Sequence, residues 1–599
     1  MPKLLSDTQP RTVLVLDGDQ ASALAIVRSL GRHGIPVQVA SNLPRPLAGH
    51  SRHAQGVLRY PDPLRCGPDF VAWLATQLQD DRFGLVIPVT ERTVVPLLRQ
   101  RSQLDDSRIA MAPSVALEQV LDKGRTLQLA RSLGIPVPRS MTVHALDELP
   151  LASADIGFPV VVKPARSVGH DALQSVQLSV SYAHSATELE ALVRHALRFG
   201  AVILQEFFRG QGVGIELIAD HGTVRQAFQH RRLHEVPLTG GGSSLRVSEA
   251  IVPALRAASE QLMQALGWHG VAMVEFKYEP ASGEFRLMEI NGRFWGSLPL
   301  AIAAGADFPV MLHELLTAGQ VGVHAPPRPG VLCRQLARDL DWLEHVLRRA
   351  APPQLVRLPS MREVLHDTLL VFSPRHHFDV QSLHDLKPGL VDLWRIARRQ
   401  WQRIAIVVKQ RRRLVTARQT AALPHGEGRK RLARAQHVLF LCHGNINRSA
   451  LAQACAEARY PGRFSVASAG FHQPCGRPAD GMMVEVARAC GIDLAHWQSS
   501  SLMAAQVERA DVIFVMELTH LDRLATEYPG AAGKAFLLGA ANATSLRNTE
   551  VPDPYGQARS RYEQVCRQVL AAVDAWFGAV PAAVHGVAQT NLLHPEPRT

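Results

Sequence analysis

A cysteine of the type that acts as a nucleophile stands at the end of an apolar segment. Cys442 lies in VLFLCHGNINRSA, residues 438–450, and Arg448 follows it by six positions. A thiolate between a strand end and a helix N-terminus is stabilised by backbone N–H groups and by the helix dipole. Gly444 permits the tight turn, and Ser449 suits a helix N-cap. Because an arginine can donate two parallel hydrogen bonds to phosphate oxygens, the pattern predicts a loop that binds a phosphate dianion and attacks its phosphorus.

A carboxylic acid that would protonate the leaving group lies in EVPDPYG, residues 550–556. Asp553 stands there between two prolines, 111 residues after Cys442. Proline fixes its own backbone angle, so this loop is expected to be stiff. An acid held near the thiolate would supply the proton that the departing oxygen needs. The alternative, a buried structural cysteine in a strand-to-helix turn, accounts for neither the arginine nor the acid loop.

Taken together, CHGNINRS and the downstream DPY resemble the low-molecular-weight protein tyrosine phosphatase family. The resemblance continues through SVASAG (465–470), GIDLAHWQSSSL (491–502) and ADVIFVME (510–517), so it covers the whole of 437–578. It implies that Cys442 forms a phosphocysteine. The other implied roles are a phosphate clamp for Arg448, a general acid for Asp553, orientation of the loop and thiolate for Asn445 and Ser449, lining of the phosphate for His443, Gly444, Ile446 and Asn447, and a wall against the aryl ring for Tyr555.

Two positions in the loop narrow the expected substrate. Many relatives carry a second cysteine where this chain has Asn447, so a protective disulfide with Cys442 is not expected. Arginine phosphatases of this fold tend to carry threonine in place of Ile446, which favours a flat aryl phosphate. Arsenate reductases of this fold need a relay of cysteines, and Cys475 and Cys490 do not stand in that pattern. The expected substrate is therefore a phosphotyrosine protein or a small aryl phosphate.

Four spaced signals in the first half of the chain favour ATP. Lys123 opens a predicted helix, and Lys163 lies on a predicted strand before a glycine turn, where an ammonium group can meet polyphosphate. Glu206, in LQEFFRG, adjoins backbone groups that suit an adenine edge. Taken singly, a strand lysine usually snorkels and a strand carboxylate is usually solvated. The fourth signal is a set of hard oxygen ligands of the kind that Mg²⁺ prefers, at the ends of two predicted strands: Glu275, Glu289 and Asn291.

This order and spacing resemble the ATP-grasp superfamily over residues 11–325, and MEINGRFWGS (288–297) resembles its metal-binding strand. Within the superfamily, the chain looks most like the carboxylate–amine ligases related to carbamoyl-phosphate synthase. The resemblance implies that ATP phosphorylates a small-molecule carboxylate and that an amine then displaces the phosphate to give an amide. Mg²⁺, or Mn²⁺ in its place, would neutralise the developing charge.

The same resemblance assigns the remaining residues of this half. The implied assignments are Lys123 and Lys163 to the ATP phosphates, Glu206 to the adenine, Gln205 to ATP without a more specific role, Glu275, Glu289 and Asn291 to the metal, and Arg293 to the transferred phosphoryl group. A flexible loop, RRLHEVPLTGGGSS (231–244), is expected to close over the substrate carboxylate through Arg232, Gly240, Gly241, Gly242 and Ser243. Two positions depart from the pattern: Gly292 stands where relatives often have proline, and Val213 stands near the place of a ribose-binding glutamate.

The positive charge of the chain is concentrated in one segment. The formal net charge is +12, and residues 395–434 hold thirteen Lys/Arg against one acid. Nucleic-acid binding by the folded domains is therefore not expected. Residues 394–413 are compatible with an amphipathic helix whose tryptophans and arginines suit an anionic membrane surface. A solvated helix and flexible linker is the simpler interpretation and the one that we favour from the sequence.

The remaining composition is that of an ordinary globular chain, with 46% hydrophobic and 20% charged residues. Seven scattered cysteines without a CxxC predict neither a disulfide framework nor a zinc site, and the cytoplasm is the expected compartment. No apolar run reaches the length of a membrane span, and the N-terminus is not a typical signal peptide.

The sequence predicts a multidomain α/β protein, because 599 residues exceed what one core supports. We expect a small parallel α/β domain, an ATP-grasp α+β domain, and a separate α/β phosphatase domain with a central parallel sheet. The predicted domains are 1–115 before the ATP-grasp domain, 116–325 for the ATP-grasp domain, 326–394 for a mixed extension, 395–434 for a basic linker, 435–580 for the phosphatase and 581–599 for a disordered tail. The expected protein is a bifunctional ligase and phosphatase. The alternative is a phosphatase regulated by a non-catalytic, ATP-sensing ATP-grasp module.

Overall fold

The computed structural model describes residues 11–79, 81–104, 106–164, 168–171, 174–177, 180–350, 355–422, 426–472 and 475–578. The predicted tail at 581–599 lies outside these residues. The chain divides into two compact units, one that ends at Ala397 and one that begins at Arg398. Each unit has its own hydrophobic core, as expected for a chain of this length.

The first unit begins with a parallel four-stranded sheet in the order β3-β2-β1-β4. Its strands are short apolar runs such as TVLV in β1, which is buried along most of its length because helices cover parallel sheets. The elements are β1 (Thr12–Val15), α1 (Ala21–Arg32), β2 (Val37–Ser41), β3 (Ala54–Arg59), α2 (Gly67–Gln79), β4 (Phe83–Ile87) and α3 (Glu91–Arg99). The predicted small parallel α/β domain is confirmed.

Two further sheets follow, one antiparallel and one mostly antiparallel. The smaller has the order β5-β10-β6-β9, and a two-stranded ribbon joins β7 to β8. The elements up to β10 are α4 (Ser114–Leu121), α5 (Lys123–Ser132), β5 (Ser140–Val143), α6 (Leu149–Ile156), β6 (Val160–Pro164), β7 (Val168–Asp171), β8 (Gln174–Gln177), β9 (Ser181–Ala183), α7 (Ala186–Ala196) and β10 (Val202–Glu206).

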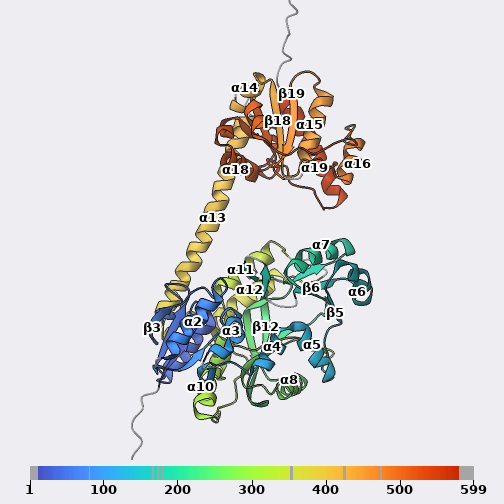
Figure 1. Ribbon diagram of the computed structural model, residues 1–599. Coiled ribbons are helices and arrows are strands. Elements are labelled where there is room, and N and C mark those ends of the chain that lie inside the picture. Colours follow the sequence, from blue (N-terminus) through green and yellow to red (C-terminus); the bar gives the residue numbers. More distant parts are fainter. Residues whose placement is uncertain are drawn as a thin grey trace, which may run out of the picture. The chain divides into compact units, whose positions relative to one another are not determined.

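The larger sheet has seven strands in the order β15-β14-β11-β12-β13-β16-β17. Two short strands from the predicted mixed extension complete it, because β16 pairs antiparallel with β13 and parallel with β17. Figure 1 shows β12 in the middle of this part of the first unit. The elements are β11 (Gln211–Asp220), β12 (Thr223–Val236), β13 (Gly242–Glu249), α8 (Pro253–Leu266), β14 (Gly270–Tyr278), β15 (Phe285–Asn291), α9 (Leu298–Ala304), α10 (Phe308–Ala318), β16 (Leu332–Arg334), α11 (Leu336–Leu347), α12 (Met361–Leu369) and β17 (His376–Phe378).

The second unit is built on a parallel four-stranded sheet in the order β19-β18-β20-β21. Helix α15 packs on α19, as does α16, whereas α14 and α18 contact β20 (Figure 1). The elements are α14 (Glu427–Ala433), β18 (His437–Cys442), α15 (Arg448–Arg459), β19 (Ser465–Gly470), α16 (Gly481–Ala489), α17 (Ala504–Arg509), β20 (Val512–Val515), α18 (Leu518–Glu527), β21 (Ala535–Leu537) and α19 (Arg559–Phe577). The predicted α/β fold class is confirmed.

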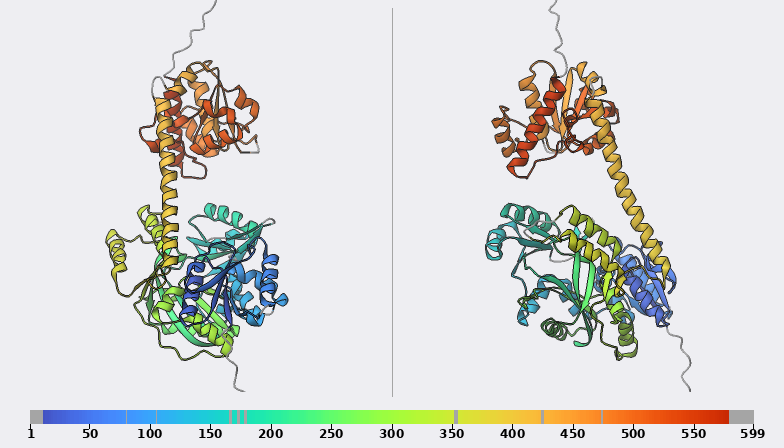
Figure 2. Two further views of the ribbon diagram at one scale, coloured as in Figure 1. Left: turned by 90° about the vertical axis from the view of Figure 1, so that its left-hand side faces the viewer. Right: turned by 180° about the vertical axis from the view of Figure 1, so that it is seen from behind.

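The segment expected to be a basic linker is largely helical. Helix α13 (Leu386–Ala422) is unbroken in both views of Figure 2, and α14 follows it. Ala421 and Leu432 belong to the core of the second unit. The end of α13 and helix α14 are therefore packed into the second unit.

Among the described helices, none is by itself both long and apolar enough to cross a membrane. Helices α9 and α10, which meet at a bend of 89°, are long and apolar enough for a membrane span only when they are taken together. Most apolar residues of this pair, Leu298 and Phe308 among them, are buried in the first unit, so the pair forms part of a protein core.

Candidate active sites

The nucleophile loop of the second unit begins where β18 ends. Cys442 is buried at the last position of β18, which lies between β19 and β20. Asn445 has a φ of 52°, in the left-handed region, and this turns its backbone N–H toward the sulfur. That N–H donates to Cys442 Sγ at 3.2 Å, and the Ser449 hydroxyl donates to the same sulfur at 3.0 Å. Two donors therefore converge on the thiol, an arrangement that suits a thiolate.

The Asn445 side chain ties this loop to its neighbours. Asn445 is fully buried. Its Nδ2 donates to Ser449 Oγ at 2.9 Å and to Ser468 Oγ at 2.8 Å, and its Oδ1 accepts from the Ser500 N–H at 2.7 Å. The predicted orienting role of Asn445 thus has a structural basis. Ser468 and Ser500 were not predicted, although both lie in segments that carried the family resemblance.

The loop is held from outside by three further residues that the sequence analysis missed. Trp497 Nε1 donates to the Asn445 carbonyl at 2.8 Å, and Arg477 Nη2 donates to the Gly444 carbonyl at 2.8 Å. Gly470, at the end of β19, passes so close that a Cβ there would lie 2.9 Å from the Asn445 nitrogen. The loop backbone is therefore fixed on both sides before any phosphate binds.

Arg448 joins the nucleophile loop to the predicted acid. Its side chain is almost fully buried at the start of α15. One guanidinium nitrogen, Nη1, donates to Glu517 Oε1 at 2.7 Å and to the Val551 carbonyl at 2.9 Å, while Nη2 lies 2.9 Å from Asp553 Oδ2. Among the described residues, none accepts a hydrogen bond from its buried Nε. A phosphate oxygen in the loop would satisfy that donor.

The mouth of the site carries aromatic and imidazole side chains. Tyr555 lies in the acid loop, two residues after Asp553, and is 65% exposed, and His443 stacks on His472 with ring centroids 5.4 Å apart. His520 is buried in α18 and stacks on Phe471. Burial, together with the nearby charges of Arg448 and His443, lowers the pKa of His520 to about 3. The His520 imidazole is therefore neutral at physiological pH, and the sequence analysis did not single it out.

In the first unit, the three predicted metal ligands lie together. Glu275 on β14 and Glu289 on β15 are direct cross-strand partners. The Asn291 amide Nδ2 donates to Glu275 Oε1 at 3.1 Å and to Glu289 Oε1 at 3.4 Å, so one atom meets both carboxylates. The three side chains thus lie in contact with one another, and their carboxylate and amide oxygens are of the kind that Mg²⁺ binds.

Cationic side chains surround these carboxylates. Lys123 Nζ lies 3.1 Å from Glu289 Oε2, and Arg232 Nη2 lies 2.5 Å from Glu275 Oε2. The charge of Lys123 lowers the pKa of Glu289 to about 2. Burial, with the neighbouring charge of Lys123, lowers the pKa of Lys163 to about 8. The three cations Lys123, Lys163 and Arg232 outnumber the two carboxylates Glu275 and Glu289, and this excess of positive charge suits a polyanionic ligand.

The other residues predicted to act on ATP pair with partners outside the three predicted metal ligands. Lys163 Nζ donates to Gln205 Oε1 at 2.6 Å, which joins β6 to β10. Glu206, in contrast, pairs its carboxylate with the exposed Arg139 at 2.6 Å. Arg293 pairs with Glu91 at 3.0 Å.

The two departures from the ATP-grasp pattern also have positions in the fold. Val213 is buried on β11. A Cβ on Gly292 would lie 2.5 Å from the ring of Trp268, so this position has no room for a larger residue.

The segment predicted as a flexible substrate loop is mostly a hairpin. Arg232 lies on β12, and Gly242 and Ser243 begin β13, so only 237–241 connect the strands. Arg232 Nη1 also donates to the Gly241 carbonyl at 3.1 Å, and Gly240 has a φ of 121°. The pairing of the two strands, which the sequence did not reveal, holds most of this segment in the sheet.

His234 anchors this hairpin from the side. Its Nδ1 lies 2.7 Å from Asp339 Oδ1 and its Nε2 3.1 Å from Asp367 Oδ2, and its ring stacks on Trp342. Burial alone would lower the pKa of His234, but the hydrogen bonds to the two carboxylates raise it. The hairpin is therefore attached to α11 and α12.

Comparison with known proteins gives a separate match for each of the two units. The family model "Low molecular weight phosphotyrosine protein phosphatase" matches residues 437–585. The "Probable low molecular weight protein-tyrosine-phosphatase EpsP" of Ralstonia nicotianae is 34% identical over 145 residues, which are 24% of this chain and 96% of that protein. The chain belongs to the low molecular weight protein-tyrosine-phosphatase family. A crystal structure of the Erwinia amylovora tyrosine phosphatase amsI is 30% identical and matches 24% of this chain and 93% of that one, with a TM-score of 0.23.

A different family model matches part of the first unit. The model "ATP-grasp in the biosynthetic pathway with Ter operon" matches residues 198–338. The carbamoyl phosphate synthase large chain of Methanosphaerula palustris is 24% identical over 296 residues, which are 47% of this chain. The match spans only 26% of that longer protein. The predicted combination of an ATP-grasp domain and a tyrosine phosphatase domain in one chain is confirmed.

Proposed function

We propose that the second unit hydrolyses aryl phosphate monoesters of the phosphotyrosine type through a phosphocysteine. The observation that carries this proposal is the meeting of three groups from two distant segments: Cys442 Sγ with its two donors and the Arg448 guanidinium from one loop, and the Asp553 carboxyl beside that guanidinium from the other. Neither the nucleophile loop nor the acid loop would suffice alone.

The proposed reaction has two steps. The Cys442 thiolate attacks phosphorus, the bond from phosphorus to the aryl oxygen breaks, and Asp553 gives its proton to the departing oxygen. Arg448 and the backbone N–H groups of the loop bind the charge on the phosphoryl oxygens. In the second step a water attacks phosphorus and gives its proton to Asp553, and inorganic phosphate leaves while the thiolate is restored.

A trapping experiment tests this scheme. With a phosphotyrosine peptide, Cys442→Ser should show no turnover and no covalent adduct. With p-nitrophenyl phosphate, whose leaving group departs without a proton, Asp553→Asn should accumulate a phosphoenzyme detectable by intact mass, because only the second step then needs the Asp553 carboxyl. A phosphoarginine peptide tested in parallel should be a much poorer substrate than the phosphotyrosine peptide. A phosphoenzyme that still forms in Cys442→Ser would contradict the assigned nucleophile.

We further propose that the first unit joins a small carboxylate to an amine at the expense of ATP. The observation that carries this proposal is the contact of the Asn291 amide with both Glu275 and Glu289. Arg232 and Lys123 pair with these two carboxylates from the side. Bound Mg²⁺, or Mn²⁺, would be held by the three oxygen-bearing side chains and would offset charge on the ATP phosphates.

The chain's own residues would then orient two substrates. Lys123 and Lys163 bind the polyphosphate of ATP, Gln205 holds the Lys163 ammonium, and Arg232 orients the carboxylate beside it. A carboxylate oxygen attacks the γ-phosphorus, ADP departs, and the amine attacks the resulting acyl phosphate to release inorganic phosphate. Both reacting groups come from substrates, so no nucleophile of the chain is needed.

The test uses the Cys442→Ser protein, in which the phosphatase is silent, so that ADP and phosphate report on the first unit alone. With Mg-ATP and pooled carboxylates and amines, ADP formation should require both pools and should be lost in the added Glu289→Gln change. ATP binding without turnover on any pool would contradict the ligase. It would favour a sensing module, which predicts phosphatase activity that changes with ATP without ADP production.

A further inference from the structure

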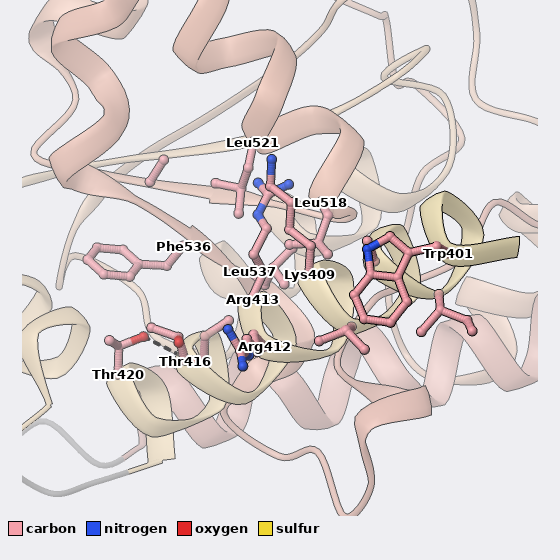
Figure 3. Close-up of a pocket in the computed structure, with 15 residues that line it drawn as sticks. Trp401, Lys409, Arg412, Arg413, Thr416, Thr420, Leu518, Leu521, Phe536 and Leu537 are labelled. Carbon is pink, nitrogen blue, oxygen red and sulfur yellow. Dashed lines mark hydrogen bonds between the residues drawn. The ribbon is translucent and has the colours of Figure 1, made fainter. Parts of the chain in front are cut away.

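An apolar cavity of the second unit lies beside α13, among the described residues. It has a volume of about 830 Å³ and opens between α13 on one side and α18 and β21 on the other. Figure 3 shows its walls, with Trp401 at one end of the view and Phe536 at the other. We call it the α13 groove, and its apolar walls are Trp401, Ile404, Val408, Leu518, Leu521 and Phe536.

One face of α13 continues this groove as an apolar stripe. Trp401, Ile404, Val408 and Val415 recur at steps of three, four and seven residues, so they lie on one side of the helix. Trp401 is 72% exposed and Ile404 is 56% exposed. Large side chains left exposed beside an apolar groove mark a binding site more often than a feature of folding.

The charge on α13 decides which occupant fits. The helix holds ten Lys/Arg and a single acid, Asp392, and Lys409 and Arg412 line the groove. Arg413 also lines it, but its guanidinium pairs with Asp522 of α18 at 2.6 and 2.9 Å and so holds the helix to the domain. A second copy of the chain would bring a like-charged helix against this one. A partner that is both anionic and apolar is therefore favoured.

We propose that the α13 groove binds anionic phospholipid at a membrane surface. Acyl chains would contact Trp401, Ile404 and the apolar wall opposite, while lipid phosphates would contact Lys409 and Arg412. A helix with an apolar face that contains tryptophan and a strongly basic remainder binds in this way in the plane of the interface. The proposal concerns recruitment to lipid and depends on neither catalytic activity.

The test is flotation of the full chain with vesicles of phosphatidylcholine, with or without phosphatidylglycerol. The protein should float with the anionic vesicles and not with the neutral ones, and added salt should weaken binding. Lys409→Gln together with Arg412→Gln should lower the partition coefficient about 25-fold, since each charge near such a surface contributes about fivefold.

A matched pair of variants tests the groove itself. Ile404 and Ile406 are 56% and 57% exposed, but Ile406 does not line the groove and projects from the other side of the helix. Ile404→Ser should lower anionic-vesicle binding several-fold, and Trp401→Ser with Ile404→Ser at least tenfold. Ile406→Ser should leave it nearly unchanged. Aryl phosphatase activity should stay at the unmutated level in every variant, because none of these residues lies in the catalytic loop. The unchanged activity would show that the domain of each variant is folded.

Four results would overturn the proposal: no flotation with anionic vesicles, equal flotation with neutral ones, an equal effect of Ile404→Ser and Ile406→Ser, or a dimer in light scattering that Trp401→Ser converts to a monomer. The last would assign the groove to a second copy of the chain.

Discussion

Replacing Gly470 by alanine should damage the phosphatase although the residue touches no substrate. A Cβ at this position would lie 2.9 Å from three backbone atoms of the nucleophile loop: the His443 oxygen, the Gly444 carbon and the Asn445 nitrogen. Carbon atoms pack favourably at about 3.5 Å or more, so the loop must move by roughly 0.5 Å. Because backbone rather than a flexible side chain is in the way, the movement displaces the donor to Cys442.

The expected cost has two parts. Overpacking of this kind destabilises by about 1–3 kcal/mol, which lowers the melting temperature of a unit of this size by roughly 2–12 °C. A 1 Å misplacement of reacting groups can cost about a hundredfold in rate, so a shift of half that size should lower kcat/KM about tenfold. Steady-state kinetics on an aryl phosphate and thermal unfolding of the second unit measure the two effects.

Gly481→Ala is the matched control, because it makes the same chemical change in the same unit where a Cβ would meet nothing within 4 Å. It should leave both quantities nearly unchanged. If Gly470→Ala behaved like Gly481→Ala, the loop would not be held by this contact, and the argument that its geometry is fixed from β19 would be refuted.

Three further changes test other parts of the reasoning. The Arg448 guanidinium makes three hydrogen-bonded or ion-paired contacts, and Arg448→Lys puts a single ammonium group in its place. The value of kcat/KM should therefore fall at least about a hundredfold in aryl phosphate assays. A smaller loss would show that the guanidinium is not the phosphate clamp. His520 has a pKa near 3 in the fold, below the ordinary value of about 6.5, so its contribution to stability is full above pH 6.5 and is lost as the pH falls toward 3. By pH 5 this loss should reach about 2 kcal/mol and should be absent in His520→Gln; urea unfolding at pH 7.5 and pH 5 measures it, and an unchanged pH dependence in the variant would contradict the assignment. In Gly292→Ala the new Cβ would lie 2.5 Å from Trp268, whereas in Gly296→Ala nothing lies within 4 Å of it. ATP turnover and the melting temperature of the first unit should therefore both be lower in Gly292→Ala than in Gly296→Ala. Equal values in the two variants would show that the site tolerates the contact.

The sequence alone determined the part of the phosphatase site that is local. Cys442 and Arg448 lie within seven residues on one strand–turn–helix, so the backbone conformation of that segment sets their separation without help from distant parts of the chain. The alternation of apolar runs likewise determined the parallel sheets, because burial on both faces requires continuous apolar strands. The three predicted oxygen ligands of the first unit lie together for a related reason, since Glu289 and Asn291 share one strand and Glu275 lies on its neighbour.

Only the tertiary structure decided which distant groups complete each site. Glu517 and Val551 meet Arg448, and Ser468 and Ser500 meet Asn445, across separations of 23 to 103 residues. Such contacts depend on strand register and helix packing, and a one-residue shift in register would turn a side chain to the other face of a sheet. The hairpin that replaces the expected flexible loop and the α13 groove have the same origin. Each arises where two segments pack together, and neither segment encodes by itself the surface that it will meet.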